Sequence, residues 1–336
     1  MLKLGTIGTN WITQQFVEAA TESGEYTLTS VYSRTKGHAD EFAQKNGADQ
    51  TYTDLQDMLE SGNVDVVYVA SPNSLHFSQA KQVIVHDLNV IVEKPAFVNP
   101  AEMKEFQLLL KEHPKALYFE AARNIHTPNF QAIASQVDKM STIQGATFTY
   151  MKYSSRYDKV LAGETPNIFT AEFAGGALQD LGVYTAYDAV TLFGMPKKAT
   201  YFPDMISTGV DGKGIAILQY PKFTVSLNFG KTSTSYQTSE IYGLKDTLII
   251  DNAGELDQVD YLAEDGTLSS LGTKLAGNSM IPEATDFAAV MVNPTNERQQ
   301  ERYTKWFKLS VEVNQLLFDL RQSAGIVFPS DETDFE

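Results

Sequence analysis

The chain has 336 residues, 43% hydrophobic and 20% charged, a length that favours two domains. Acidic residues outnumber basic ones 42 to 26, and the formal net charge of −16 argues against nucleic acid and anionic membranes as partners. The lack of cysteine excludes disulfides and thiolate sites, and with no leader-like start and no apolar run of the ~20 residues that span a bilayer we expect a cytoplasmic protein.

The first third of the chain alternates strand and helix patterns. Predicted strands cover Leu2–Ile7, Tyr26–Ser33, Val64–Ala70, Asn89–Glu93 and Ala116–Glu120, and predicted helices run from the first turn to about Ser23 and over Thr35–Asn46, Leu75–His86 and Pro100–Glu112. This alternation is typical of a doubly wound parallel sheet, so we predict an N-terminal α/β Rossmann domain over residues 1–123 that binds a dinucleotide.

The turn after the first strand carries part of a dinucleotide fingerprint, and its candidate cofactor-binding residues are Gly8, Thr9, Asn10, Trp11 and Ile12. Gly8 fills the first place of the pattern GxGxxG, but Asn10 and Thr13 stand where the other small residues belong. Asparagine tolerates left-handed backbone angles, so the turn can form, although its side chain occupies space that the pyrophosphate should approach. By itself the turn is equally compatible with an ordinary strand–turn–helix.

A basic cluster follows the second strand. An NAD-binding domain usually holds the ribose hydroxyls there with an acidic residue, whereas this chain offers Ser33, Arg34 and Lys36, with His38 nearby. Arginine binds a phosphate through paired hydrogen bonds, and a lysine adds a point charge. We therefore predict NADP rather than NAD, although NAD remains possible; the alternative is a solvated basic turn.

The loop after the third strand supplies Ser71, Pro72, Asn73 and His76 as further candidate cofactor contacts. Pro72 stops the strand, and the polar side chains can cap the next helix. Helix capping is the simpler interpretation, and it is compatible with the same loop contacting a ribose.

The fourth strand ends in Glu93, Lys94 and Pro95. Its apolar core, Val90–Val92, suits a central parallel strand buried on both faces. Because Pro95 ends the pairing, Glu93 and Lys94 emerge at the carboxyl edge of the sheet, where ligands bind in open α/β folds. We take both as cofactor contacts and Lys94 also as catalytic; a simple ion pair at the sheet rim is the alternative.

From about Asn124 the alternation stops, and residues 124–336 predict an α+β domain for substrate binding and oligomerisation. Predicted strands cover Gln144–Tyr153, Ala199–Ile206, Gly214–Tyr220, Phe223–Asn228, Gln237–Tyr242 and Asp246–Asp251, and predicted helices cover Pro128–Lys139, Ala177–Phe193, Glu283–Val292 and Gln299–Ser323. Short links between strands indicate a large, mostly antiparallel sheet, whose uncovered face predicts a homodimer or higher homo-oligomer. The aperiodic segment 154–173 is either a lid or a plain surface loop, and the acidic tail 331–336 is expected to be solvated.

Asp180 and Tyr184 are four residues apart on the predicted helix that follows Gly175-Gly176, so we expect them to share one helix face. The pattern by itself favours the simpler interpretation, a half-buried amphipathic helix with a tyrosine at its edge.

These pieces together resemble the glucose-fructose oxidoreductase and inositol dehydrogenase family of dinucleotide-dependent enzymes, over essentially the whole chain. The matching residues are Gly5-x-x-Gly8, Ala70-Ser71-Pro72-Asn73-x-x-His76, Glu93-Lys94-Pro95, Glu120-Ala121 and Gly175-Gly176-Ala177-Leu178-x-Asp180-x-Gly182-x-Tyr184. Tyr184 in place of the common histidine resembles the branch of dihydrodiol dehydrogenase and NADP-dependent D-xylose dehydrogenase. The departures are Asn10, in place of glycine, and Arg123-Asn124-Ile125, which does not match the branch's pattern after Glu-Ala.

The resemblance implies an NADP-dependent oxidoreductase that transfers a hydride between nicotinamide and a sugar, polyol, diol or carbonyl substrate. Lys94, Tyr184 and Asp180 would be catalytic: Tyr184 as proton donor or base, Lys94 as the ammonium that favours its phenolate, and Asp180 as a partner of Lys94 or of a substrate hydroxyl. The alternatives are a glycosidase that keeps its dinucleotide bound and a non-enzymatic dinucleotide sensor. We expect no metal site, because the five histidines show no paired ligand spacing.

Overall fold

The computed structural model describes residues 1–331. They form two compact units, the first made of residues 1–123 and 277–310, the second of residues 124–276 and 311–331. The predicted acidic tail lies, apart from Asp331, outside the described residues. Within the described part of the chain, no helix is both long enough and apolar enough to cross a membrane.

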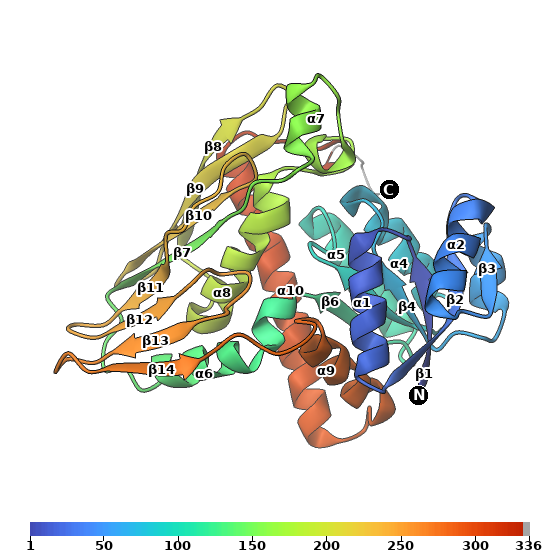
Figure 1. Cartoon of the computed structure of the whole chain (residues 1–336), viewed down its shortest axis with the longest axis horizontal. Coiled ribbons are helices and arrows are strands. Elements are labelled where there is room, and N and C mark those ends of the chain that lie inside the picture. Colours follow the sequence, from blue (N-terminus) through green and yellow to red (C-terminus); the bar gives the residue numbers. More distant parts are fainter. Residues whose placement is uncertain (332–336) are drawn as a thin grey trace. The chain divides into compact units, whose positions relative to one another are not determined.

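The first unit is built on a six-stranded sheet with strand order β3-β2-β1-β4-β5-β6, in which all five strand pairs are parallel (Figure 1). The strands are β1 (Leu2–Ile7), β2 (Tyr26–Tyr32), β3 (Gln50–Tyr52), β4 (Val66–Val69), β5 (Asn89–Glu93) and β6 (Tyr118–Ala121). The prediction of a doubly wound sheet is confirmed. The direction of strand addition reverses between β1 and β4, and ligands of such folds bind outside the carboxyl ends at this switch point.

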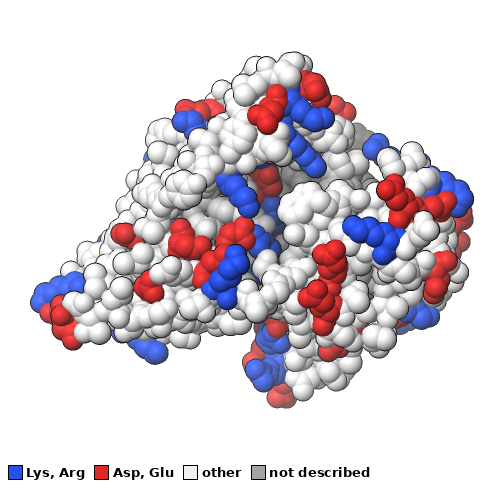
Figure 2. Space-filling view, in the orientation of Figure 1, with Lys and Arg blue, Asp and Glu red and all other residues white. Residues whose placement is uncertain are grey.

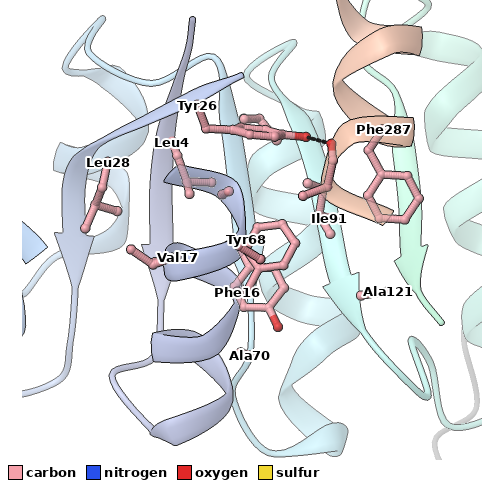
Figure 3. Close-up of a cluster of buried hydrophobic side chains, with 14 of the residues drawn as sticks. Leu4, Phe16, Val17, Tyr26, Leu28, Tyr68, Ala70, Ile91, Ala121 and Phe287 are labelled. Atoms are coloured by element: carbon pink, nitrogen blue, oxygen red, sulfur yellow. Dashed lines mark hydrogen bonds between the residues drawn. The ribbon is translucent and has the colours of Figure 1, made fainter. Parts of the chain in front are cut away.

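Helices cover this sheet on both faces. They are α1 (Trp11–Glu22), α2 (Lys36–Asn46), α3 (Leu55–Glu60), α4 (His76–Ile84), α5 (Pro100–Glu112) and α9 (Ile281–Val292). Figure 3 shows the core on one face, where Phe16 of α1 stacks on Tyr68 of β4 with ring centroids 3.9 Å apart. Because the central strands are covered on both sides, every residue of β4 is buried, as the continuous apolar pattern predicts.

Residues 277–310 belong to the first compact unit, whereas the predicted second domain began at residue 124 and included everything after it. Helix α9 docks on the Rossmann sheet, where the Tyr26 hydroxyl donates to the carbonyl of Ala284 at 2.8 Å (Figure 3). Phe287 stacks on Phe119 of β6 at 4.8 Å between centroids. The apolar stripe of α9 therefore completes the hydrophobic core of the first unit. The local sequence of α9 does not reveal which unit it joins.

The second unit contains an eight-stranded sheet with strand order β14-β13-β12-β11-β7-β10-β9-β8 (Figure 1). The strands are β7 (Gly145–Met151), β8 (Lys198–Met205), β9 (Asp211–Gln219), β10 (Thr224–Gly230), β11 (Ser239–Tyr242), β12 (Thr247–Ile250), β13 (Val259–Leu262) and β14 (Leu268–Gly272). Only the β7–β10 pair is parallel among the pairs of this described sheet, so the prediction of a mostly antiparallel sheet is confirmed.

The remaining helices are α6 (Pro128–Val137), α7 (Tyr157–Leu161), α8 (Val183–Phe193) and α10 (Glu297–Ser323), whose residues up to Ser310 belong to the first unit. Helix α8 lies against one face of the eight-stranded sheet (Figure 1). The predicted helix 177–193 is only partly α-helical, because Leu178–Gly182 forms a π-helical turn before α8 begins. The aperiodic segment 154–173 contains α7 and a 3-10 turn at Asn167–Phe169.

Candidate active site

The glycine turn after β1 lies at the switch point between β1 and β4. Gly8 has φ +110°, a conformation that side chains rarely adopt. A Cβ atom at Gly8 would stand 2.9 Å from the carbonyl oxygen of Ala70, at the end of β4. Only glycine fits this close approach of two chain segments, and the turn leaves a cradle of the kind that admits a pyrophosphate.

The Asn10 side chain closes the turn. Its Oδ1 accepts from the backbone N–H groups of Ile12 at 2.9 Å and Thr13 at 3.2 Å, which caps α1. Its Nδ2 donates to the Ala70 carbonyl at 2.8 Å and so ties β1 to β4. We predicted that this side chain would occupy space that the pyrophosphate should approach; in the structure its polar atoms are engaged with the protein backbone.

The other residues of the turn differ in exposure. Thr9 and Ile12 are half-buried, whereas the indole of Trp11 is 62% exposed at the start of α1. An exposed aromatic ring beside the glycine turn offers an apolar surface next to the predicted cofactor.

The basic cluster after β2 is only partly available to a ligand. Arg34 is exposed and Ser33 half-buried, and α2 starts just beyond them without a side-chain cap. Lys36 is paired with Asp40 at 3.0 Å, and hydrogen bonds from Thr51 and Lys36 lower the pKa of that carboxyl. Arg34 is thus the cation best able to bind a phosphate. On the face shown in Figure 2, basic and acidic side chains are interspersed rather than gathered in one broad patch.

The predicted cofactor loop after β4 is held from within. Ser71 donates to Gln79 at 2.7 Å, while Pro72 and Asn73 are half-buried around a 3-10 turn. His76 is fully buried, with Nε2 2.8 Å from the carbonyl oxygen of Ser71 and Nδ1 3.2 Å from that of Pro95. Burial lowers the pKa of His76, an effect that the carbonyl groups of Ser71 and Pro95 oppose, and the ring connects the ends of β4 and β5.

Lys94 stands half-buried at the carboxyl end of β5, as predicted, and is followed by a cis peptide bond to Pro95. The segment after it is fixed because Glu120 accepts from the backbone N–H of Ala96 at 3.0 Å. Glu93 is buried and hydrogen-bonded to the Tyr68 hydroxyl; burial raises its pKa, against the opposing charge of Lys94. Glu93 therefore points into the core and contributes to the support of Lys94.

A second buried carboxyl, missed in the sequence, lies in the same unit. Glu283 on α9 is completely buried, and neither of its carboxylate oxygens has a hydrogen-bond partner among the described residues. Burial and the charge of Glu93 raise its pKa well above the usual range, opposed by the charge of Arg123. Its position on an amphipathic helix gives no sign of this in the sequence.

The residues that depart from the branch pattern have structural partners. Arg123 donates to Ser279 at 2.6 Å within the first unit. Asn124 is buried in the second unit and donates to Asp188 of α8 at 2.8 Å. Burial raises the pKa of Asp188 well above its usual range, opposed by the hydrogen bond from Asn124, and this contact anchors α8.

Asp180 lies in the π-helical turn, so the expected i,i+4 relation with Tyr184 on a regular α-helix is replaced by a wider local geometry. Its Oδ2 is 2.8 Å from Nζ of Lys231, which follows β10 and is 1% exposed. The side chain of Asp180 remains 36% exposed. Sequence reasoning missed Lys231, because a lysine in a polar turn resembles a solvated residue.

The glycine pair that precedes this turn is required by close packing. A Cβ atom at Gly175 would lie 2.6 Å from the carbonyl oxygen of Ile168, and one at Gly176 would overlap Asp211. Asp211 in turn accepts at 2.7 Å from the backbone N–H of Leu178 and at 2.7 Å from the Tyr201 hydroxyl. A buried carboxyl from β9 therefore organises the start of the helix that carries Asp180 and Tyr184.

Tyr184 is the second residue of α8 and is 7% exposed. Its ring packs edge-to-face on Tyr150 of β7, with centroids 5.4 Å apart and an interplanar angle of 88°. This contact fixes the ring. The phenol hydroxyl can donate one hydrogen bond and can also accept one.

Known proteins match the chain in sequence and in structure. Residues 2–121 match the family described as an oxidoreductase family with an NAD-binding Rossmann fold. The oxidoreductase YgjR of Escherichia coli is 38% identical over 98% of this chain and 99% of its own, and the scyllo-inositol 2-dehydrogenase (NADP(+)) IolU of Bacillus subtilis is 37% identical over 99% of this chain and 100% of its own. In structure, the 3-ketoreductase KijD10 of Actinomadura kijaniata, solved with NADP and TDP-benzene, has a TM-score of 0.83 at 20% identity, covering 96% of this chain and 97% of that one.

The likeness to KijD10 shows the shared fold. The identity to the two bacterial relatives extends over nearly the whole chain and includes the second unit, which the family match at residues 2–121 does not reach. The chain is therefore a member of the glucose-fructose oxidoreductase and inositol dehydrogenase family and is an NAD(P)-dependent oxidoreductase of the dehydrogenase type.

Proposed function

We propose that the protein is an NADP-dependent dehydrogenase or reductase that acts on a sugar, polyol or diol. The observation that carries this proposal is the glycine turn at the switch point. There Gly8 lies so close to the Ala70 carbonyl that no side chain could replace its hydrogen. The fit to a dinucleotide rests on that cradle. The name of the relative IolU includes NADP(+) and a cyclic polyol, which supports the same cofactor and substrate class here.

The preference for NADP is assigned to Arg34. The carboxyl end of β2 carries no acidic residue, and Arg34 is exposed beside the start of α2. A charge-assisted hydrogen bond to the 2′-phosphate contributes about 1.5–3 kcal/mol, which corresponds to roughly 10- to 100-fold in affinity.

The test compares kcat/KM with NADPH and NADH for Arg34→Ala and for the matched variant Lys36→Ala. We expect the first to lose NADPH efficiency alone, and the second to change little, since Lys36 is paired with Asp40. A wild-type preference for NADH contradicts the cofactor assignment.

For the chemistry, the bound nicotinamide supplies or accepts the hydride. We assign proton transfer at the reacting oxygen to Tyr184, whose ring is held by Tyr150. We assign the stabilisation of the developing alkoxide to the ammonium of Lys94. Asp180, partly exposed beside its own ammonium partner, accepts a hydrogen bond from a substrate hydroxyl.

A screen of aldoses, polyols and vicinal diols, read by NADPH absorbance, identifies the substrate. We expect Tyr184→Phe to cut turnover by about 10²- to 10⁴-fold without loss of folding, and Lys94→Ala to abolish the chemical step with little loss of cofactor binding. Full activity of Tyr184→Phe would move proton transfer to Lys94 or water. Bond cleavage without net NADPH turnover would favour the dinucleotide-retaining glycosidase, and cofactor binding without any turnover would favour a sensor.

We further propose that the chain forms a homodimer or higher homo-oligomer through the exposed face of the eight-stranded sheet. Phe202 of β8 and Ile215 of β9 are register partners on this face and are 61% and 47% exposed. Light scattering should show an oligomer at micromolar concentration that Phe202→Asp weakens. The control is Val292→Asp, at a position 57% exposed on α9 in the first unit, which should leave the oligomer intact.

A further inference from the structure

Lys231 is a buried cation whose side-chain partners come from two other parts of the second unit. It directly follows β10 and is 1% exposed. Its Nζ lies 2.8 Å from Asp180 Oδ2, 3.3 Å from the carbonyl oxygen of Ile168 and 4.4 Å from the ring centroid of Phe169. A buried ammonium is tolerated only with such compensation, since desolvation of an isolated charge is very costly.

These partners connect the aperiodic segment 154–173 to the motif turn. Ile168 and Phe169 belong to the 3-10 turn of that segment, and Phe169 is itself fully buried. The Ile168 carbonyl also accepts from the backbone N–H of Gly176 at 3.1 Å. The Ile168 carbonyl therefore accepts hydrogen bonds from both the Lys231 ammonium and the Gly176 backbone. Segment 154–173, the motif turn and the end of β10 thus meet at Lys231.

The burial of the ion pair is one-sided. Lys231 is closed to solvent, whereas the side chain of Asp180 remains 36% exposed. A molecule that reaches this pair from solvent meets the carboxylate and not the ammonium. An ionised carboxylate only accepts hydrogen bonds, so it recognises neutral hydroxyl groups and repels carboxylates and phosphates.

We propose that Lys231 is a positioning residue for the substrate: it holds the Asp180 carboxylate in place, and it holds segment 154–173 against the motif. The carboxylate held in this way selects neutral polyhydroxy compounds over sugar acids and sugar phosphates. This inference rests on the proposed dehydrogenase function for its kinetic part. Its mechanical part, the hold on segment 154–173, is independent of any activity. A merely structural ion pair would contribute to stability alone.

The experiment uses the full chain with Lys231→Met, which removes the charge at similar length, and Lys231→Arg, which retains it. The control is Lys213→Met, because Lys213 forms an exposed ion pair with Asp204 in the same unit. Hydrogen–deuterium exchange over residues 154–173 measures how often this segment opens. NADPH binding, measured by energy transfer from tryptophan, monitors the first unit, and steady-state kinetics separate KM from kcat.

For Lys231→Met we expect faster exchange over residues 154–173, NADPH affinity within about twofold of wild type, and a KM for a polyol raised at least about tenfold with a smaller change in kcat. Discrimination against the corresponding sugar acid should fall. Lys231→Arg should keep part of the wild-type behaviour, and Lys213→Met all of it.

Two results overturn the proposal: wild-type exchange and KM in folded Lys231→Met, or a loss of kcat/KM that is the same in an Asp180→Asn background. If Lys231 acts through Asp180, the double variant Lys231→Met/Asp180→Asn loses no more than Asp180→Asn alone. The double variant also removes both charges, which keeps the test available if Lys231→Met alone does not fold. If the wild-type enzyme turns over no polyol, the dehydrogenase proposal fails, while the exchange data still decide whether Lys231 holds the segment.

Discussion

Asn10 makes a testable contribution to the dinucleotide turn, and the size of that contribution follows from the three hydrogen bonds that its side chain forms with backbone groups. Loss of a side-chain helix cap costs about 1 kcal/mol, and loss of a net hydrogen bond such as that to the Ala70 carbonyl costs about 1 kcal/mol more. We therefore expect Asn10→Ala to lower the free energy of unfolding by about 2 kcal/mol. In a unit of this size that corresponds to about 4–8 °C in Tm.

Two further substitutions at Asn10 separate its roles. Asn10→Asp keeps the cap acceptor but presents an oxygen to the Ala70 carbonyl, so it should lose the cross-strand bond, about 1 kcal/mol. Asn10→Gly restores the usual residue of the fingerprint, costs only a few tenths of a kcal/mol as a cap, and loses the same bond.

The assays are thermal unfolding by calorimetry and NADPH binding for all three variants. We expect binding to weaken in Asn10→Ala, because the turn loses its preorganisation. An unchanged Tm in Asn10→Ala would show that the cap and the bond to Ala70 contribute nothing in solution. Tighter NADPH binding by Asn10→Gly would show that the native side chain obstructs the pyrophosphate after all.

Two other buried groups yield predictions. A carboxyl with a raised pKa binds its proton more tightly in the folded state, so Glu283 lowers the stability of the fold only above the usual glutamate pKa of about 4.3, and increasingly as pH rises. Glu283→Met should therefore raise Tm at neutral pH, by a margin that shrinks towards pH 4. An equal gain at both pH values would contradict this argument. Gly176→Ala should cost more than about 3 kcal/mol, because the added methyl overlaps Asp211. Gly194→Ala has open space around it, but φ +74° and ψ −169° favour glycine, so it should cost about 1–3 kcal/mol in the same thermal-unfolding assay.

Local sequence signals predicted the elements that carry strong patterns. Helix α5 was predicted with its observed bounds, because Pro100 occupies its first turn and Asn99 caps it. Strand β5 was predicted correctly from its run of buried apolar residues. Strands β3, β13 and β14, of three to five residues, were not predicted; β14 is largely exposed and has no apolar alternation to reveal it.

The remaining differences depend on contacts between distant parts of the chain. The local sequence of α9 does not reveal which core it joins; its place is set by contacts with distant residues of the first unit, among them Tyr26 and Phe119. The π-helical turn at Leu178–Gly182 interrupts a pattern that reads as continuous α-helix. Lys231 stands far along the chain from its partner Asp180, and its burial arises from the fold and not from its neighbours in sequence.

Both family motifs use glycine in the same physical way. Gly8 admits the Ala70 carbonyl, and Gly176 admits Asp211, at distances where any Cβ atom would collide. In each case a nearby polar side chain, Asn10 or Asp211, then accepts from backbone N–H groups of the helix that begins there.

These motif residues therefore build turns before they can bind anything. The residues left to recognise ligands are those that remain at least partly exposed at strand ends and helix starts, such as Arg34, Lys94 and Asp180. Substitution of a turn residue should thus reduce stability and activity together, whereas substitution of a ligand-facing residue should reduce activity alone.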